Sequence, residues 1–330
     1  MPDWLNRLIA VVRSTSVWHI VGIVFSIAII AVSAMVLIRI LRDIDFNAVV
    51  TALRAIPARQ IWLALGCVLV GYITLTLYDL FALRTIGRAD VPYRIAALAG
   101  FSAYTIGHNL GMTAVTCAAV RYHVYSARGL QIIDVAKVCF VTGLTFWLGN
   151  VAVLGLAIAY DPTVAASLDQ LSPQVNRTMA LATLAGLLFY VAWVWHKPRT
   201  IGYADWSITL PGGPLTLLQI GIGFVDLVCC ALAMYLLLPA QPDIPFASFA
   251  VIFVGSLLLG FLSHAPGSIG VFDAAMLLAL DQFDKAELLA GLLLYRLIYF
   301  IIPFGIALAM LAGRAIWLAR FDTAQPIRDA

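Results

Sequence analysis

Charged side chains are scarce in this sequence. Asp, Glu, Lys and Arg make up 11% of its 330 residues, whereas 63% of the residues are hydrophobic and the mean hydropathy is +0.98. Soluble domains contain about 45–50% apolar residues. The composition therefore excludes a soluble globular protein and indicates an integral membrane protein.

The sequence also lacks the motifs that would indicate an enzyme active site. It contains no Walker loop, no GxSxG and no HExxH sequence. An Asp-x-Asp sequence at Asp43 and Asp45 could hold a metal and a sugar nucleotide, but two carboxylates at this spacing are common by chance. We expect no metal and no cofactor.

The sequence contains few cysteines, and their spacing does not indicate paired ligands or disulfides. The five cysteines form no CxxC pair, and all lie in or beside apolar segments, at Cys67, Cys117, Cys139, Cys229 and Cys230. We expect them to be small core residues rather than disulfides or metal ligands.

Lysine is rare among the 20 basic residues and occurs only at Lys137, Lys197 and Lys285. The arginines cluster at the ends of apolar segments, and the net charge is +3. This pattern is typical of topology signals and lipid headgroup contacts, not of a nucleic-acid surface. The predicted partners are a membrane and a phospholipid, and no nucleic acid.

What the sequence has in abundance is apolar stretches of about 20 residues, the length that crosses a bilayer. The clearest are Val17–Leu41, Ile61–Leu83, Val138–Tyr160, Met179–Trp195, Leu215–Leu238 and Leu288–Leu311. The first is longer than the apolar core of a typical signal peptide, so we expect it to be retained as a span.

The charges of the connecting loops predict the topology. Residues 161–176 and 239–246 are poor in Lys and Arg, whereas residues 121–137 and 196–199 are rich in them. By the positive-inside tendency the first pair is external, and the second pair and the C-terminus are cytoplasmic. Residues 247–283 must then enter and leave the membrane on one side.

We therefore expect residues 247–283 to form a re-entrant hairpin with its tip near Pro266 and Gly267. A second apolar segment, residues 93–125, is interrupted by polar residues and glycines and could also enter and return, at Gly100, Gly107, His108, Asn109 and Gly111. Irregular backbone is tolerated in a bilayer only where protein or a water-filled cavity satisfies it, as in transporters with inverted repeats.

The predicted fold is an all-α polytopic membrane protein with about six full spans and two re-entrant helical hairpins. It divides into an N-terminal interfacial segment (1–16), a first repeat (17–160), a second, inverted repeat (161–313) and a cytoplasmic tail (314–330). Charge counting leaves the orientation of the first half open, because this topology places four arginines outside, Arg39, Arg42, Arg54 and Arg59.

Four charged residues lie in or beside the spans and are candidate ligands. Arg296 is surrounded by apolar residues and is suited to a phosphate contact or to an ion pair, for which Asp226 is the expected partner. Asp79 lies near the end of its span, where a pair with Arg84 is the alternative to a functional role. Arg121 is expected to be interfacial, and its ordinary role would be that of a cytoplasmic anchor.

Polar residues and glycines at the presumed hairpin tips are weaker candidates. His108, Asn109 and His264 commonly satisfy freed backbone groups at such breaks. Gly267, Ser268 and Gly270 belong to a GSIG sequence whose backbone N–H groups could bind an anion, and Asp273 closes the motif as a cap or an ion-pair partner, although a single GxxG is a weak signal.

Five segments together resemble one family, YDLFALRTIG (78–87), RYHVYSARGL (121–130), LTFWLG (144–149), SHAPGSIGVFD (263–273) and LLLYRLIYFIIP (292–303). They resemble the N-terminal membrane half of the bacterial multiple peptide resistance factor, which fuses a phosphatidylglycerol lysyltransferase to a flippase for the aminoacylated lipid. The transferase of that family is a separate C-terminal domain. This sequence ends at Ala330 without it and so resembles the members that consist of the membrane part alone.

The resemblance implies roles for Asp79, Arg121, Asp226 and Arg296, which match the charged residues of the family's membrane motifs. Two matches are imperfect. Ala118 and Ala119 stand where a Gly-Gly pair is expected, and Ser268 stands where the second glycine of Pro-Gly-Gly is expected. The lipid handled could therefore differ from lysyl-phosphatidylglycerol.

The sequence thus predicts a phospholipid translocase of the bacterial inner membrane. Arg121 and Arg296 would bind the phosphate, while Asp79, Asp226 and Asp273 would balance them or bind a cationic headgroup. The alternatives are a membrane-embedded transferase with Asp43 and Asp45 at a metal, and a non-catalytic partner of a separate synthase. A second copy of the chain is a further candidate partner.

Overall fold

The computed structural model describes residues 31–42, 44–197, 199–203 and 206–322. Residues 31–42 are helical. The elements that follow are α3 (Phe46–Ala55), α4 (Ala58–Thr85), α5 (Tyr93–Leu110), α6 (Thr113–Tyr125), η1 (Ser126–Arg128), α7 (Ile132–Tyr160), α8 (Thr163–Asp169), α9 (Pro173–His196), β1 (Thr200–Tyr203), β2 (Trp206–Thr209), α10 (Gly213–Tyr235), α11 (Phe246–Ser263), η2 (Pro266–Ser268), α12 (Val271–Ala279), α13 (Lys285–Arg296), η3 (Leu297–Ile301) and α14 (Ile302–Asp322).

Six helical segments of the described chain are long and apolar enough to cross a membrane: α4, α7, α9, α10, α11 and the continuous segment Lys285–Ile316. Five of them coincide with predicted spans, which confirms those predictions. The first predicted span, residues 17–41, lies mostly outside the described residues. The remaining segment is α11, which belongs to the residues that the sequence predicts to form a re-entrant hairpin.

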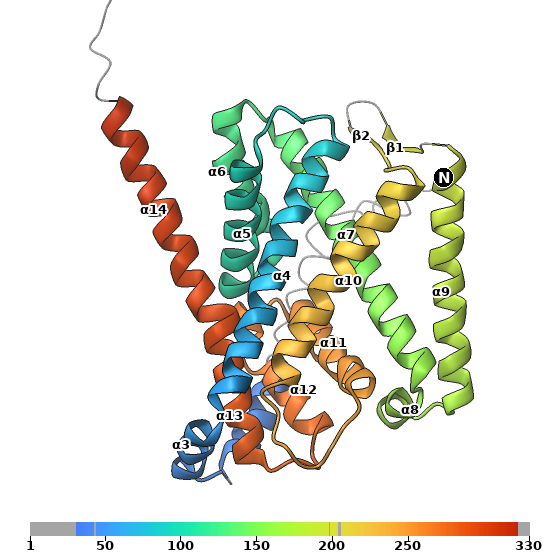
Figure 1. Cartoon of the computed structure of the whole chain (residues 1–330), viewed down its shortest axis with the longest axis vertical. Helices are drawn as coiled ribbons and strands as arrows, with labels where there is room; N and C mark the ends of the chain where they lie inside the picture. Colours follow the sequence, from blue (N-terminus) through green and yellow to red (C-terminus); the bar gives the residue numbers. More distant parts are fainter. Residues whose placement is uncertain (1–30, 43, 198, 204–205, 323–330) are drawn as a thin grey trace, which may run out of the picture.

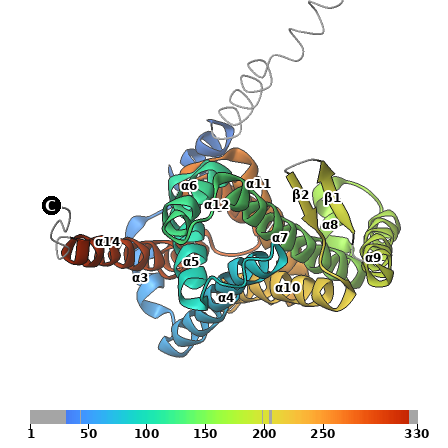
Figure 2. The ribbon, with the colours of Figure 1, turned by 90° about the horizontal axis from the view of Figure 1, so that it is seen from above.

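The long helices form one bundle, and two helix pairs occupy opposite halves of it. Figure 1 shows α4, α7, α9 and α10 running the length of the bundle, with α5 and α6 beside their upper half and α11 and α12 beside their lower half. Seen from above, α9 lies at one side and α14 projects away from the other (Figure 2). The antiparallel strands β1 and β2 pair Thr200 with Thr209 at the upper end.

Both helix pairs reverse direction at residues with left-handed backbone. Helix α5 ends at Gly111 (φ 78°), Met112 (φ 47°) follows, and α6 returns. Between α11 and α12 the residues with positive φ are His264, Gly267, Ser268 and Gly270. The break predicted near Pro266 and Gly267 is therefore present. The break predicted among residues 100–111 falls at Gly111, the last of the five interrupting residues, because the other four lie within α5. Each break connects two packed helices.

The two breaks contact each other inside the bundle. A Cβ atom on Gly111 would lie 2.8 Å from the carbonyl oxygen of His264 and 3.1 Å from the nitrogen of Pro266. Glycine is required at position 111 both for this close approach and for its positive φ. The tip of the first helix pair is thus packed against the tip of the second.

Helices α7 and α10 cross at a pair of glycines. A Cβ atom on Gly149 would lie 2.5 Å from the carbonyl carbon of Gly223, and one on Gly223 would lie 2.5 Å from the carbonyl oxygen of Thr145. The two backbones are therefore in direct contact, as in other membrane helix pairs with small residues at the crossing. Close to this crossing Gln219 donates to the hydroxyl of Thr145 at 2.9 Å.

Candidate functional site

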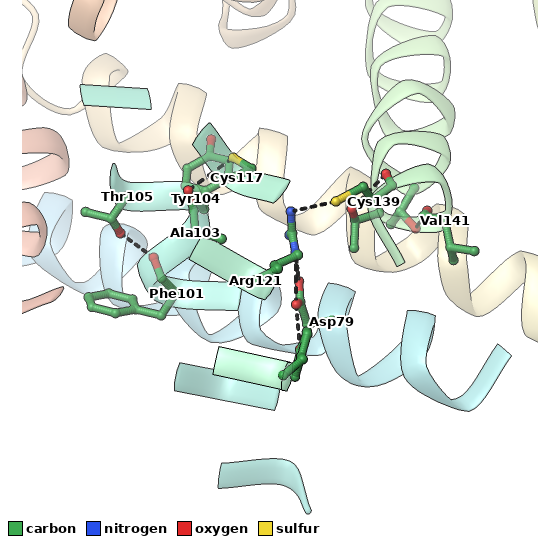
Figure 3. A network of polar contacts seen from close by, with 12 residues as sticks. Asp79, Phe101, Ala103, Tyr104, Thr105, Cys117, Arg121, Cys139 and Val141 are labelled. Carbon is green, nitrogen blue, oxygen red and sulfur yellow. Dashed lines mark hydrogen bonds and ion pairs between the residues drawn. The ribbon is translucent and has the colours of Figure 1, made fainter. Parts of the chain in front are cut away.

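A buried ion pair joins α4 to α6. The guanidinium of Arg121 donates to Asp79 through Nη2 at 2.7 Å and through Nε at 3.0 and 3.1 Å, and Figure 3 shows Arg121 between Asp79 and Cys139. Asp79 is fully buried and Arg121 is 7% exposed. The hydroxyl of Tyr125 also donates to Asp79, at 2.7 Å. Both carboxylate oxygens are therefore satisfied, as a buried charge requires.

Of the alternatives for Asp79, the pair with Arg84 is not formed, because Arg84 is exposed and Asp79 pairs with Arg121. Arg121, which the sequence predicts to lie at an interface, is buried among protein side chains. Tyr125 was missed, although its spacing from Arg121 gave a signal, because residues four apart share one face of a helix. Gly100 lets α5 approach the same carboxylate, since a Cβ atom there would lie 3.1 Å from Asp79 Cγ.

Arg121 also faces a cavity of about 190 Å³ between α4, α5, α6, α7 and α11. Apolar side chains form most of its wall, and the polar ones are Tyr78, Tyr104, His108, Thr113, Arg121 and Thr142. Trp147 lines the cavity and is 48% exposed, so the cavity reaches the outer surface of the bundle beside α7. On the side away from Asp79, the nearest partner of Arg121 Nη1 is the sulfur of Cys139 at 3.9 Å.

A small second cavity of about 10 Å³ lies next to the first, at the break between α11 and α12. The two cavities share His108, Thr113, Phe146 and Phe261 as wall residues. The second is also lined by His264, Ala265 and Ser268. The cavity beside Arg121 therefore neighbours the point where the two helix pairs meet.

Arg296 forms the second ion pair, with Asp273 and not with Asp226. Its Nη2 and Nε donate to the two oxygens of Asp273 at 2.6 and 2.8 Å, and Nη1 donates to the carbonyl of Gly267 at 2.9 Å. The predicted Arg296–Asp226 pair is wrong because α13 turns Arg296 toward the α11–α12 break, whereas Asp226 on α10 faces α4.

The GSIG sequence could offer its backbone N–H groups to an anion, but three of these groups donate within the chain. The N–H groups of Ser268 and Ile269 donate to the carbonyls of Ala265 and Pro266, and that of Gly270 donates to Asp273. Gly267 and Ser268 instead turn their carbonyl oxygens toward Arg296. The carbonyl oxygens of the break thus bind the guanidinium of Arg296, and these hydrogen bonds stabilise the backbone conformation of the break.

Asp226 is buried, with 1% of its surface exposed. It accepts a hydrogen bond from the hydroxyl of Tyr78 at 3.0 Å, and the thiol of Cys230 lies 3.8 Å from its other oxygen. The ion pairs of the described residues join Arg88, Arg121 and Arg296 to other carboxylates, and none includes Asp226.

The polar residues at the breaks contact backbone carbonyls, as expected. Asn109 donates to Thr105 at 2.8 Å and to Phe300 at 3.4 Å. The Nδ1 atoms of His108 and His264 lie 3.0 Å from the carbonyl of Tyr104 and 2.9 Å from that of Leu262, respectively. His108 additionally lines both cavities, a role that the sequence did not indicate.

The Asp-x-Asp sequence has an ordinary structural explanation at one of its two residues. Asp45 is exposed and caps α3 by accepting from the N–H of Asn47 at 2.9 Å. Asp43 lies outside the described residues. Within the described part of the chain no cluster of three or more His, Cys, Asp or Glu residues could hold a metal.

Comparison with known proteins relates the chain to bacterial membrane proteins. No family model matches it. It is homologous to the uncharacterized protein slr0712 of Synechocystis, with 29% identity over 74% of this chain and 76% of the relative. It is also homologous to the inner membrane protein YbhN of Escherichia coli, with 27% identity over 81% of this chain and 84% of the relative.

A shorter match extends to a larger enzyme. The phosphatidylglycerol lysyltransferase of Staphylococcus xylosus is 37% identical over 89 residues, which are 26% of this chain and 11% of that enzyme. The predicted resemblance is thus confirmed for part of the chain, and an inner membrane location is supported by the match to YbhN together with the six candidate spans.

Proposed function

We propose that this homologue of YbhN is a phospholipid translocase, which moves a phospholipid with an amine-bearing headgroup between the leaflets of the inner membrane. The observation that carries the proposal is the position of Arg121. It is a buried guanidinium, fixed on one side by Asp79, that faces an apolar cavity on the other. The partial match to phosphatidylglycerol lysyltransferases supports a lipid as substrate.

The cavity combines the two properties that a phospholipid needs. Arg121 Nη1 has donors directed away from Asp79, and a guanidinium binds phosphate oxygens well because it is planar and always charged. The apolar wall suits acyl chains, and the opening beside Trp147 faces the bilayer. A headgroup that crosses hydrocarbon loses its hydration, and a buried charge along the path offsets part of that cost.

We further propose that the α5–α6 and α11–α12 pairs are re-entrant hairpins that enter from opposite faces of the membrane and meet near its midplane, as parts of an inverted repeat. Their location in opposite halves of the bundle and the contact of Gly111 with His264 support this arrangement. Substrate sites of many transporters lie where such broken helices meet.

The proposal is tested with purified protein in liposomes that carry a fluorescent phosphatidylethanolamine or lysyl-phosphatidylglycerol in one leaflet. The protein should accelerate exchange between leaflets. The double variant Asp79→Asn, Arg121→Gln removes both charges together and so avoids an unpaired buried carboxylate. It should slow exchange about tenfold or more, because a hydrogen bond to a charged group contributes about 1.5–3 kcal/mol.

The matched control is the double variant Arg88→Gln, Asp90→Asn, which removes an ion pair at the surface. It should exchange lipid as fast as the parent. Absence of exchange by folded parent protein with every headgroup, with and without an ion gradient, would contradict the translocase. Equal rates for the parent and the Asp79–Arg121 variant would show that Arg121 does not contact the lipid.

A further inference from the structure

Asp226 is a buried carboxylate that the lipid site described above does not use. It lies in the middle of α10, and α4 approaches it closely because Gly71 has no side chain, with a Cβ atom there placed 3.7 Å from Asp226 Oδ1. Ionisable residues buried inside membrane segments are costly and usually pair with one another or mark ion and proton pathways. Asp226 lacks a basic partner among the described residues.

The titratable groups around Asp226 are neutral when protonated. They are tyrosines and cysteines from five elements, Tyr72 and Tyr78 on α4, Tyr104 on α5, Tyr295 on α13, Tyr299 on η3, and Cys229 and Cys230 on α10 itself. Helix α11 has no titratable residue, and α7 has none between Cys139 and Tyr160. Nothing described near the carboxylate supplies a compensating positive charge.

Hydroxyl and thiol groups connect Asp226 to the cavity by two routes. Tyr78 lines the cavity and donates directly to Asp226. The second route begins at Tyr104, which also lines the cavity and whose hydroxyl lies 3.2 Å from that of Tyr299. Tyr299 lies 2.9 Å from the sulfur of Cys230, which is 3.8 Å from Asp226.

These groups fit a proton better than a metal ion. Sodium, calcium and magnesium need several oxygen ligands, and among the described residues one hydroxyl oxygen, that of Tyr78, lies at hydrogen-bond distance from the carboxylate. A proton needs only the carboxylate oxygen itself and a donor chain. Tyr78 can pass its hydroxyl proton to Asp226 and receive a replacement from the cavity side, and it is then neutral before and after the transfer.

We propose that Asp226 is a proton-binding site, reached from the Arg121 cavity through Tyr78 and through Tyr104, Tyr299 and Cys230, and that its protonation couples lipid movement to the proton gradient. The coupling rests on the proposed function, whereas the proton site does not. The buried acid is neutral when it carries the proton and negative when it has released it. The charge beside the cavity therefore changes with each cycle.

The proton site is tested by infrared spectroscopy of the full-length protein in lipid, with aspartate carboxyl carbons labelled with carbon-13. A carboxylic acid and a carboxylate absorb at different frequencies, so a pH titration shows which form is present. The parent should show a carboxylic acid band that disappears as pH rises. This band should be lost in Asp226→Asn, which keeps the shape and the acceptor for Tyr78, and it should persist in Asp243→Asn, an exposed loop residue.

The route through Tyr78 to Asp226 is tested by a matched pair of tyrosine variants. Tyr78→Phe removes the donor to Asp226 and should displace the pH at which the band disappears. Tyr125→Phe removes the equivalent donor to Asp79 and should leave that pH unchanged. A band that never titrates, or that survives Asp226→Asn, would refute the proton site.

The coupling is tested separately in liposomes with an imposed pH gradient. The gradient should change the rate of lipid exchange by the parent and should have no effect on exchange by Asp226→Asn. If the spectroscopic band titrates but exchange ignores the gradient in the parent, the proton site stands and the coupling is refuted. Absence of exchange under all conditions would instead contradict the translocase itself.

Discussion

Within the described bundle, two largely buried arginines are held by carboxylates in bidentate pairs, and the two pairs have different surroundings. Arg121 is enclosed by Asp79 and the cavity, whereas Arg296 is enclosed by Asp273 and the carbonyls of the α11–α12 break. A buried pair contributes little net stability compared with apolar residues, but loss of one partner leaves an unpaired buried charge. The consequences of substitution therefore depend on which partner remains.

Arg296→Ala should destabilise the protein by about 3–5 kcal/mol, because it leaves the carboxylate of Asp273 without its positive partner and two carbonyl oxygens without their donor. Adding Asp273→Ala should recover part of the lost free energy of unfolding. Adding Asp226→Ala should instead give a loss equal to the sum of the losses of the two single variants. Unfolding in detergent, followed by intrinsic fluorescence, measures the parent, the three single variants and the two double variants. Recovery by Asp226→Ala and additivity with Asp273→Ala would contradict the ion pairing described here.

Helix crossings that bring backbones into contact determine how the elements pack. At the α7–α10 crossing neither Gly149 nor Gly223 has space for a methyl group. Gly223→Ala should therefore destabilise the protein by about 1–3 kcal/mol through overpacking. Gly221→Ala on the same helix has nothing within 4 Å and is the control.

The control should be neutral or stabilising by up to about 1 kcal/mol, since alanine is the better helix former. Thermal unfolding of the two variants in the same detergent provides the comparison. Equal loss of stability in both would mean that substitution of glycine in α10, and not the contact with α7, causes the effect.

The sequence predicted the helices and chain breaks better than the ion-pair partners and the contacts between helices. Apolar length was enough to predict α4, α7, α9 and α10, and the glycines at 111 and 267 were enough to predict chain breaks, because both are local properties. The partner of Arg296 was not predictable, since it depends on how α13 is rotated about its axis. The pairing of Asp79 with Arg121 and the Gly149–Gly223 contact depend on the packing of helices distant in sequence.

On the scale of the whole molecule, the two helix pairs define which loops share a face of the membrane. If both pairs are re-entrant, single cysteines at Asp243 and Gln282 should be labelled by an impermeant thiol reagent from one side, and cysteines at Ala89 and Ala127 from the other. All four positions are exposed. The background protein should lack the native cysteines, and whole cells and inverted vesicles provide the two sides.

A cysteine at Asp169 serves as a reference for the first side, because the loop between α8 and α9 lies at the same end of the bundle as the α10–α11 loop in Figure 1. Labelling of Asp243 and Gln282 from opposite sides would mean that α11 and α12 together cross the membrane. The inverted repeat would then be lost with the hairpin.

The contact between Gly149 and Gly223 has a mechanical consequence. Because the backbones of α7 and α10 touch at this point, α10 cannot move closer to α7 there, and a tilt of α10 would turn about this contact. Asp226 lies three residues from Gly223, about 4.5 Å along the axis, whereas the end of α10 at Gly213 lies ten residues away, about 15 Å. A rocking helix would move its end about three times as far as its carboxylate. Any tilt of α10 about this contact would therefore change the packing at the Gly213 end of the bundle more than the surroundings of Asp226.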